Sequence, residues 1–296
     1  MDAAIETRGL TKRFGKRRAL NGIDLSIPPG QVFGYLGPNG AGKTTTIRLL
    51  AGLLRPTAGT ASILGMDVVR DRDRMQRRLG YLPGSFVGYP DLSGEQYLRY
   101  LANLRGGVDW DVVTSMAKRL DLDLRRRVGV LSHGNRQKVG IVQALMHGPE
   151  LVILDEPTTG LDPIIQQEFL GLVRDFRDAG GTVFLSSHIM SEVEAVADHV
   201  GIIRDGSLVL VDSVELLKRR ALRRMDLTFA GEPPQTLSAI AGVRELTISG
   251  STAHLAVEGS TADLLAEAAP HRVVQIVTHE PDLEEIFLSY YERQAR

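Results

Sequence analysis

Short apolar runs divide most of the chain into predicted strands. In the run at 18–27, Ile23, Leu25 and Ile27 alternate with polar neighbours, so this run and the one before it predict two strands joined by basic turn residues. Several later runs are continuously apolar, which is typical of strands buried on both faces. The strands predicted before the C-terminal region are 4–14, 18–27, 31–36, 61–65, 79–84, 151–154, 182–186, 199–204 and 207–212.

Apolar residues at helical spacing follow several of these strands, so strands and helices alternate. Helical patterns dominate from residue 91 to 148. There Ser93-Gly94-Glu95-Gln96 has the form of a capping box, a helix runs from Asp109 through Leu120, and Ser132 is a natural N-cap. We therefore predict an α/β domain with a mostly parallel sheet and a mostly helical insertion at about 85–148.

The order of elements changes after the basic residues Lys218-Arg219-Arg220. The elements predicted there are strands at 225–230, 243–249, 253–257 and 273–278, a short helix after the first strand, and helices at 261–269 and 282–290. This order is α+β and is compatible with a ferredoxin-like fold. We therefore expect two domains, 1–220 and 221–296.

Composition limits the kinds of partner. The net charge of -1 and the pI near 6.7 argue against a global nucleic-acid footprint. The chain has no cysteine, which excludes disulfides and thiolate metal sites. Its first residues lack a basic region followed by an apolar run, so we expect no signal peptide. Since no apolar run approaches the roughly 18 residues of a membrane span, we expect any membrane association to depend on a partner.

A glycine-rich segment lies between a predicted strand and a predicted helix. It consists of Gly37, Pro38, Asn39, Gly40, Ala41, Gly42, Lys43, Thr44 and Thr45. This is the phosphate-binding pattern, in which backbone N–H groups and a positive helix end point at a triphosphate. In that pattern Lys43 reaches the outer phosphates and the Thr44 hydroxyl holds Mg²⁺. A chance match in a chain with 31 glycines is the alternative, and the flanking strand and helix argue against it.

Two adjacent acids follow the apolar run at 151–154. In open α/β sheets ligands bind at the carboxyl ends of the strands. Asp155 is therefore a candidate for the Mg²⁺ shell, and Glu156 a candidate for orienting or deprotonating water. The alternative is an acidic surface turn.

Four more residues each have a structural and a functional interpretation. His188 follows a buried strand at the same expected sheet edge, so we favour a phosphate contact over a structural role. Phe14 suits strand packing or stacking on a base. Ser132 and Asp162 are both natural N-caps, and Pro163 after Asp162 strengthens that interpretation.

Five segments then match, in order, the motifs of one family. They are GPNGAGKTTT, LSHGNRQK at 131–138, LVILDEP at 151–157, GLDP at 160–163, and SSHIMSE with His188. Together they resemble the nucleotide-binding subunit of an ATP-binding-cassette (ABC) transporter over about residues 4–220. The combination is more specific than the phosphate loop, which many NTPases share. The resemblance implies a P-loop NTPase core with an antiparallel β subdomain.

The resemblance also implies ATP and Mg²⁺ as ligands. The implied roles are adenine stacking for Phe14, phosphate and Mg²⁺ contacts for Lys43, Thr44 and Thr45, the Mg²⁺ shell for Asp155, the catalytic base for Glu156, and γ-phosphate sensing for His188. In the family, Ser132 and Gly134 contact ATP held by a second nucleotide-binding subunit, in a head-to-tail homodimer, and the aspartate loop with Asp162 adds to the nucleotide site. The implied partner is an integral membrane permease subunit, which places the chain peripherally on the cytoplasmic face of the membrane.

The tail, with Pro281-Asp282-Leu283-Glu284-Glu285-Ile286-Phe287, is similar to that of drug-resistance-type ATPases paired with type-2 export permeases. We therefore expect an exporter ATPase. The alternatives are a non-transport ABC ATPase acting on nucleic acid or ribosomes and a regulatory module with little turnover. Gly84 motivates the last of these, because the family often has glutamine there. His133 and Asn135 also depart from the usual signature.

Overall fold

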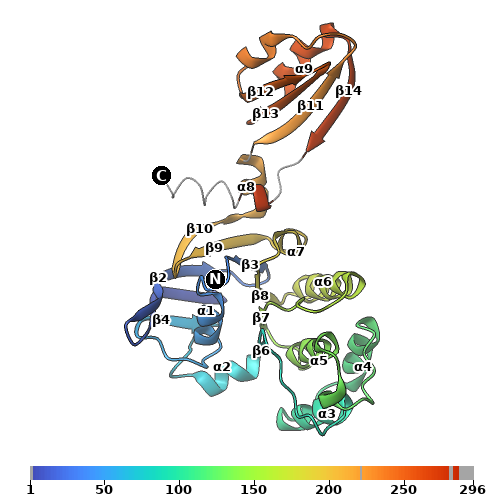
Figure 1. Cartoon of the computed structure of the whole chain (residues 1–296). Coiled ribbons are helices and arrows are strands. Elements are labelled where there is room, and N and C mark those ends of the chain that lie inside the picture. Colours follow the sequence, from blue (N-terminus) through green and yellow to red (C-terminus); the bar gives the residue numbers. More distant parts are fainter. Residues whose placement is uncertain (1–2, 221, 280–282, 287–296) are drawn as a thin grey trace. The chain divides into compact units, whose positions relative to one another are not determined.

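The computed structural model describes residues 3–220, 222–279 and 283–286. The chain divides into two compact units, Met1–Val211 and Asp212–Arg296, which are described separately (Figure 1). This division falls before the boundary expected after residue 220, because helix α8 (Val214–Arg220) belongs to the second unit.

The first unit contains an antiparallel sheet with the strand order β2-β1-β4-β5. Its strands are β1 (Ile5–Phe14), β2 (Arg17–Ile27), β4 (Ala58–Ile63) and β5 (Met66–Asp67). Strand β1 pairs with both β2 and β4, and inward-facing residues such as Ile5 and Leu10 are fully buried. The predicted hairpin and antiparallel subdomain are confirmed.

A second, six-stranded sheet has the order β10-β9-β3-β8-β7-β6. Its strands are β3 (Val32–Leu36), β6 (Leu79–Leu82), β7 (Leu151–Asp155), β8 (Thr182–Ser187), β9 (His199–Arg204) and β10 (Ser207–Ser213). The neighbours from β9 through β6 pair in parallel. Every residue of β3, β7 and β8 is buried, which explains why these strands are continuously apolar or nearly so.

Seven α-helices lie in the described part of the first unit, and four of the seven begin at a residue whose side chain caps the helix. They are α1 (Lys43–Leu50), α2 (Arg72–Arg78), α3 (Gly94–Leu104), α4 (Trp110–Arg119), α5 (His133–Leu145), α6 (Pro163–Asp178) and α7 (Met190–Glu194), with a 3₁₀ turn η1 (Val128–Val130) before α5. Ser93 and Gln96 form the complete capping box. Asp109, Ser132 and Asp162 each accept a backbone N–H at the start of a helix, as predicted.

The sequence pattern also predicts a helix at 189–197, and helix α7 is shorter than that, so the prediction was wrong at its C-terminal end. The backbone N–H of Asp198 donates to the Val32 carbonyl, and the Asp198 carboxylate accepts from the Val32 N–H at 2.8 Å. These two bonds fix the chain against the start of β3, so the helix ends before it reaches residue 197.

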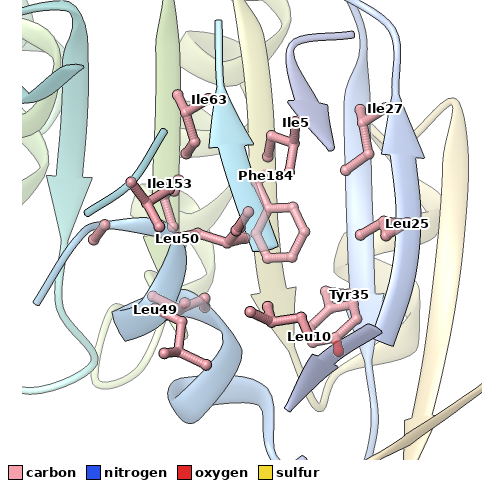
Figure 2. Close-up of a cluster of buried hydrophobic side chains, with 14 of the residues drawn as sticks. Ile5, Leu10, Leu25, Ile27, Tyr35, Leu49, Leu50, Ile63, Ile153 and Phe184 are labelled. Atoms are coloured by element: carbon pink, nitrogen blue, oxygen red, sulfur yellow. The ribbon is translucent and has the colours of Figure 1, made fainter. Parts of the chain in front are cut away.

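A single hydrophobic cluster joins the two sheets through α1 (Figure 2). Phe184 of β8 is at its centre with no exposed surface, and its ring lies 5.7 Å from that of Phe33 and 5.1 Å from that of Tyr35. Leu49 and Leu50 of α1 are also fully buried in the cluster. Because α1 is anchored here, the phosphate loop that precedes it starts and ends on rigid elements.

The second unit is built on an antiparallel sheet with the order β12-β13-β11-β14. In chain order its elements are α8, β11 (Arg223–Phe229), η2 (Gln235–Ala239), β12 (Val243–Ser249), β13 (Thr252–Val257), α9 (Ala262–Ala268), η3 (Ala269–His271) and β14 (Val273–His279). This is the ferredoxin-like order with the first helix reduced to a 3₁₀ turn. Of the helix predicted at 282–290, residues 283–286 are helical and the others lie outside the described residues.

Candidate functional site

The phosphate loop connects β3 to α1. The backbone of Gly42 has φ 116°, a conformation that L-residues with side chains rarely adopt, and this residue is the N-cap of α1. Lys43 is buried, and its Nζ donates to the Gly37 carbonyl at 2.6 Å, so the lysine closes back over the loop. Lys43 therefore places a positive charge at the start of α1, and this arrangement favours the binding of a phosphate.

A cavity of about 800 Å³ opens beside this loop. Its wall contains most of the residues expected at a nucleotide site, namely Phe14, Pro38, Asn39, Gly40, Gly42, Lys43, Thr44, Thr45, Glu156 and His188. Gly37 and Ala41 belong to the loop but not to the wall. Phe14 is 49% exposed, so strand packing does not account for its ring. An aromatic residue with this much exposed surface on a cavity wall is available for stacking.

The cavity also includes residues that sequence reasoning missed. They are Arg17, Arg18, Ala19, Gly84, Thr159, Asp205 and Gly206. The sequence singles out only Gly84 among them, as a departure from the family pattern and not as a site residue. The one signal for the arginines was the basic turn directly after Phe14. Nothing in the sequence indicates that the turn between β9 and β10 comes near the loop. It does so because Gly206 N–H donates to the Ala41 carbonyl at 2.9 Å, while Asn21 N–H donates to the Gly206 carbonyl at 2.7 Å.

Three predicted site residues form a chain of polar contacts. Lys43 Nζ lies 3.1 Å from Glu156 Oε1, and His188 Nδ1 lies 2.5 Å from Glu156 Oε2. Glu156 has φ 50°, a left-handed conformation that is uncommon for a residue with a side chain. Its backbone is fixed by an N–H bond to the Ser186 carbonyl at 3.1 Å. Such strained residues concentrate at functional sites, where neighbouring structure holds them.

Asp155 lies directly behind the cavity wall and is 2% exposed. Its Oδ1 accepts a bond of 2.7 Å from the Ser186 hydroxyl. Its Oδ2 faces Gly84, where an added Cβ would come within 3.3 Å. Burial and then the charge of Asp155 raise the pKa of the Tyr81 phenol. Asp155 is therefore a buried carboxylate with one oxygen bound to protein and one directed toward a residue of the wall.

The donors here fit a hard divalent cation that is shared with phosphate. The Thr44 side chain is exposed in the cavity, and Asp155 supplies carboxylate oxygen. Within residues 3–220, 222–279 and 283–286 there is no cluster of three or more His, Cys, Asp or Glu able to hold a metal ion. Mg²⁺ suits such a donor set, since one or two protein groups and substrate phosphates are its usual ligands.

Ser132, Gly134 and Asp162 do not line the cavity of their own chain. Ser132 is exposed at the start of α5, where its hydroxyl accepts from Asn135 N–H at 3.3 Å. A Cβ on Gly134 would come within 2.3 Å of the Gly160 carbonyl, so the signature segment packs tightly against the aspartate loop. The capping interpretations of Ser132 and Asp162 are confirmed, and neither residue lines the cavity beside the phosphate loop.

None of the helices in the described part of the chain is long and apolar enough to span a membrane.

The fold and this site are those of a nucleotide-binding ATPase core. The profile of the ABC transporter family matches residues 20–159. The chain is 36% identical over 235 residues to the bacitracin transport ATP-binding protein BcrA of Bacillus licheniformis, covering 78% of this chain and 77% of that one. It is 38% identical over 253 residues to the daunorubicin/doxorubicin resistance ATP-binding protein DrrA of Streptomyces peucetius, covering 81% and 76%.

Among solved structures, the chain is similar to one described as the ATP-binding subunit of an ABC transporter. The TM-score is 0.68 at 28% identity, over 73% of this chain and 92% of that one. The chain therefore belongs to the ABC transporter family. It is an ATP-binding, ATP-hydrolysing subunit of the kind that powers a membrane transporter.

Proposed function

We propose that the chain powers drug-type export by hydrolysing MgATP in the cavity beside the phosphate loop. The observation that carries the proposal is the contact chain from Lys43 through Glu156 to His188 on the cavity wall. Phosphoryl transfer requires mainly positioning and charge neutralisation. One cation, one carboxylate and one imidazole in contact beside a helix start supply both.

Each residue then has a defined task. Phe14 stacks on the adenine, while the loop from Gly37 to Thr45 binds the phosphates. Thr44 and Asp155 would hold Mg²⁺, which would supply positive charge to neutralise the phosphates. Glu156 accepts the proton of the attacking water, and His188 keeps that carboxylate in place and contacts the γ-phosphate.

A second copy of the chain completes the site. Ser132 and Gly134 lie at the exposed N-terminus of α5, outside the cavity of their own chain. A helix N-terminus attracts anions, so in a head-to-tail homodimer this end covers the γ-phosphate held by the partner. Asp162, at the start of α6, lies in the loop that packs against Gly134 and belongs to the same face.

The other partner is an integral membrane permease, which holds the chain on the cytoplasmic face of the membrane. The names of the similar bacitracin and daunorubicin/doxorubicin proteins support an export role. The near-neutral net charge supports a protein partner over nucleic acid.

The test compares purified wild type with the Lys43→Ala variant and identifies what accompanies the native chain. We expect wild type to hydrolyse ATP in the presence of Mg²⁺, and Lys43→Ala to weaken ATP binding by at least about tenfold, because a buried cation is removed from the phosphates. Purification from native membranes should recover a multi-spanning permease. Unchanged ATP affinity in the variant, or recovery of ribosomes or DNA in place of a permease, would contradict the proposal.

A further inference from the structure

Glu192 is a buried carboxyl that contacts two loops of the site. It lies on α7 and is 8% exposed. Its Oε2 accepts a bond of 2.7 Å from the Thr158 hydroxyl and one of 3.3 Å from the Ser187 hydroxyl. Thr158 lies two residues after Glu156, and Ser187 directly precedes His188. One oxygen atom therefore joins the two segments that carry the proposed base and the proposed γ-phosphate sensor.

His188 needs such support, because burial does not fix its side chain. The imidazole is 51% exposed and contacts Glu156 from the end of β8. The turn that carries it is held by Ser187, whose hydroxyl also accepts from Ile189 N–H at 2.9 Å. The position of the imidazole therefore depends on Ser187, and Ser187 is held by Glu192.

The two carboxylate oxygens of Glu192 differ in their polar contacts. Its second oxygen, Oε1, is buried and has no hydrogen-bond partner among the described residues. Burial is the largest cause that raises the pKa of the Glu192 carboxyl, and the charge of Glu156 raises it further; the bonds from the Thr158 and Ser187 hydroxyls and the charge of His188 oppose that shift. A buried carboxyl with an unpartnered oxygen is costly to stability, which is unusual for a side chain that only fills space.

We propose that Glu192 is a positioning residue that fixes the His188 turn to the segment after Glu156, so that the imidazole stays on the carboxylate of the base. This rests on the proposed roles of Glu156 and His188. Glu192 does not face the cavity and touches no reacting atom.

The test uses Glu192→Ala, Glu192→Gln and the control Glu194→Gln on the same helix, each in the full chain. Glu192→Ala removes both hydroxyl contacts, so we expect kcat for ATP hydrolysis to fall about 10- to 100-fold, as small misplacements of catalytic groups do. The Kd for ATP should stay within about threefold, because Glu192 is outside the cavity. Glu192→Gln keeps an oxygen that accepts from both hydroxyls and should retain most activity.

Two further readouts separate positioning from general stability. The imidazole ¹⁵N signals of His188, assigned with His188→Ala, should move in Glu192→Ala and stay unchanged in Glu192→Gln. In a double-mutant cycle, Glu192→Ala should cost little more in a His188→Ala background, because the group it positions is gone. Should Glu192→Ala fail to fold, Thr158→Val keeps the carboxyl while removing one contact, and it should move the same signals.

Unchanged His188 signals in Glu192→Ala, or losses that multiply in the double variant, would overturn the proposal. Failure of the proposed function would look different, because His188→Ala or Glu156→Gln alone would then leave hydrolysis intact. If the proposed function fails, the ¹⁵N signals of His188 still test whether Glu192 positions the imidazole, because that measurement requires no ATP hydrolysis.

Discussion

Replacing Glu156 with glutamine tests two roles of one carboxylate. The side chain is the proposed base, and it also holds Lys43, whose Nζ lies 3.1 Å from Oε1. Glutamine keeps the shape of the side chain and removes its charge. We therefore expect opposite effects on turnover and on ATP affinity, because the base is lost while Lys43 is released to the phosphates.

The magnitudes follow from the geometry. Loss of a general base lowers turnover by about 10²- to 10⁴-fold. Opposite unit charges about 3 Å apart attract by about 5 kcal/mol at an effective dielectric constant of about 20. When ATP binds to wild type, Lys43 exchanges most of its attraction to Glu156 for an attraction to the phosphates. The cost of desolvating the charged groups offsets part of the difference. A net gain of about 1–2 kcal/mol is left, which lowers the Kd for ATP about 5- to 30-fold.

The assays are steady-state phosphate release and equilibrium binding of ATP, each on wild type, Glu156→Gln, Lys43→Ala and the double variant. The affinity gain should vanish in the Lys43→Ala background, because it depends on that lysine. Glu267→Gln in the second unit is the control for loss of a carboxylate elsewhere. Turnover within about threefold of wild type would remove Glu156 from the role of base. An equal gain in ATP affinity with and without Lys43 would show that the Glu156 carboxylate and the phosphates do not compete for this lysine.

Three further variants test the core, a half-buried histidine and the altered loop. Phe184→Ala empties a site with no exposed surface and should lower the free energy of unfolding by about 3–5 kcal/mol in urea titrations; a loss below about 1.5 kcal/mol would contradict close packing. Burial lowers the pKa of His147 to about 4, while its unfolded value stays near 6.5, so stability is full above about pH 6.5 and falls as the pH drops from there toward 4. We put this loss of folding stability at about 1–2 kcal/mol, because the His147 ring is partly exposed. His147→Gln should make the loss smaller. If urea midpoints of the variant keep the pH dependence of wild type, other groups cause the loss. Gly84→Gln should fold if Asp155 gives way by a few tenths of an ångström, because a Cβ there comes within 3.3 Å of its Oδ2, and the variant should raise turnover several-fold; an unchanged rate would show that position 84 does not affect hydrolysis.

The sequence identified elements well where local chemistry decides them. Ser93, Ser132 and Asp162 cap helices as predicted, and Asp109 caps the helix that was predicted to begin there, because a side-chain acceptor and a helix start are neighbours in the sequence. The end of α7 was misplaced because Asp198 bonds to Val32, a residue far away in the sequence.

The site was predicted in part for the same reason. Residues predicted from a motif, such as Lys43 and Glu156, lie on the cavity wall. The cavity-wall residues Arg17 and Asp205 were missed, because only the folded sheets bring them to the loop. Glu192 had no motif to mark it, and its role emerges only from bonds to hydroxyls on two separate loops.

Strand register explains why motifs far apart in the sequence meet at one site. Strand β8 pairs with β3 and β7 in parallel, with Ser187 opposite Leu36 and Ser186 opposite Asp155. Glu156 therefore leaves β7 level with Ser187 of β8, and the phosphate loop and His188 begin one residue further along, so all three leave the sheet within one residue of the same level. A shift of β8 by one residue would move His188 by about 3.3 Å and place its preceding side chains on the opposite faces of the sheet. The contact of 2.5 Å between His188 and Glu156 therefore depends on the register of the buried strands as much as on the two residues themselves.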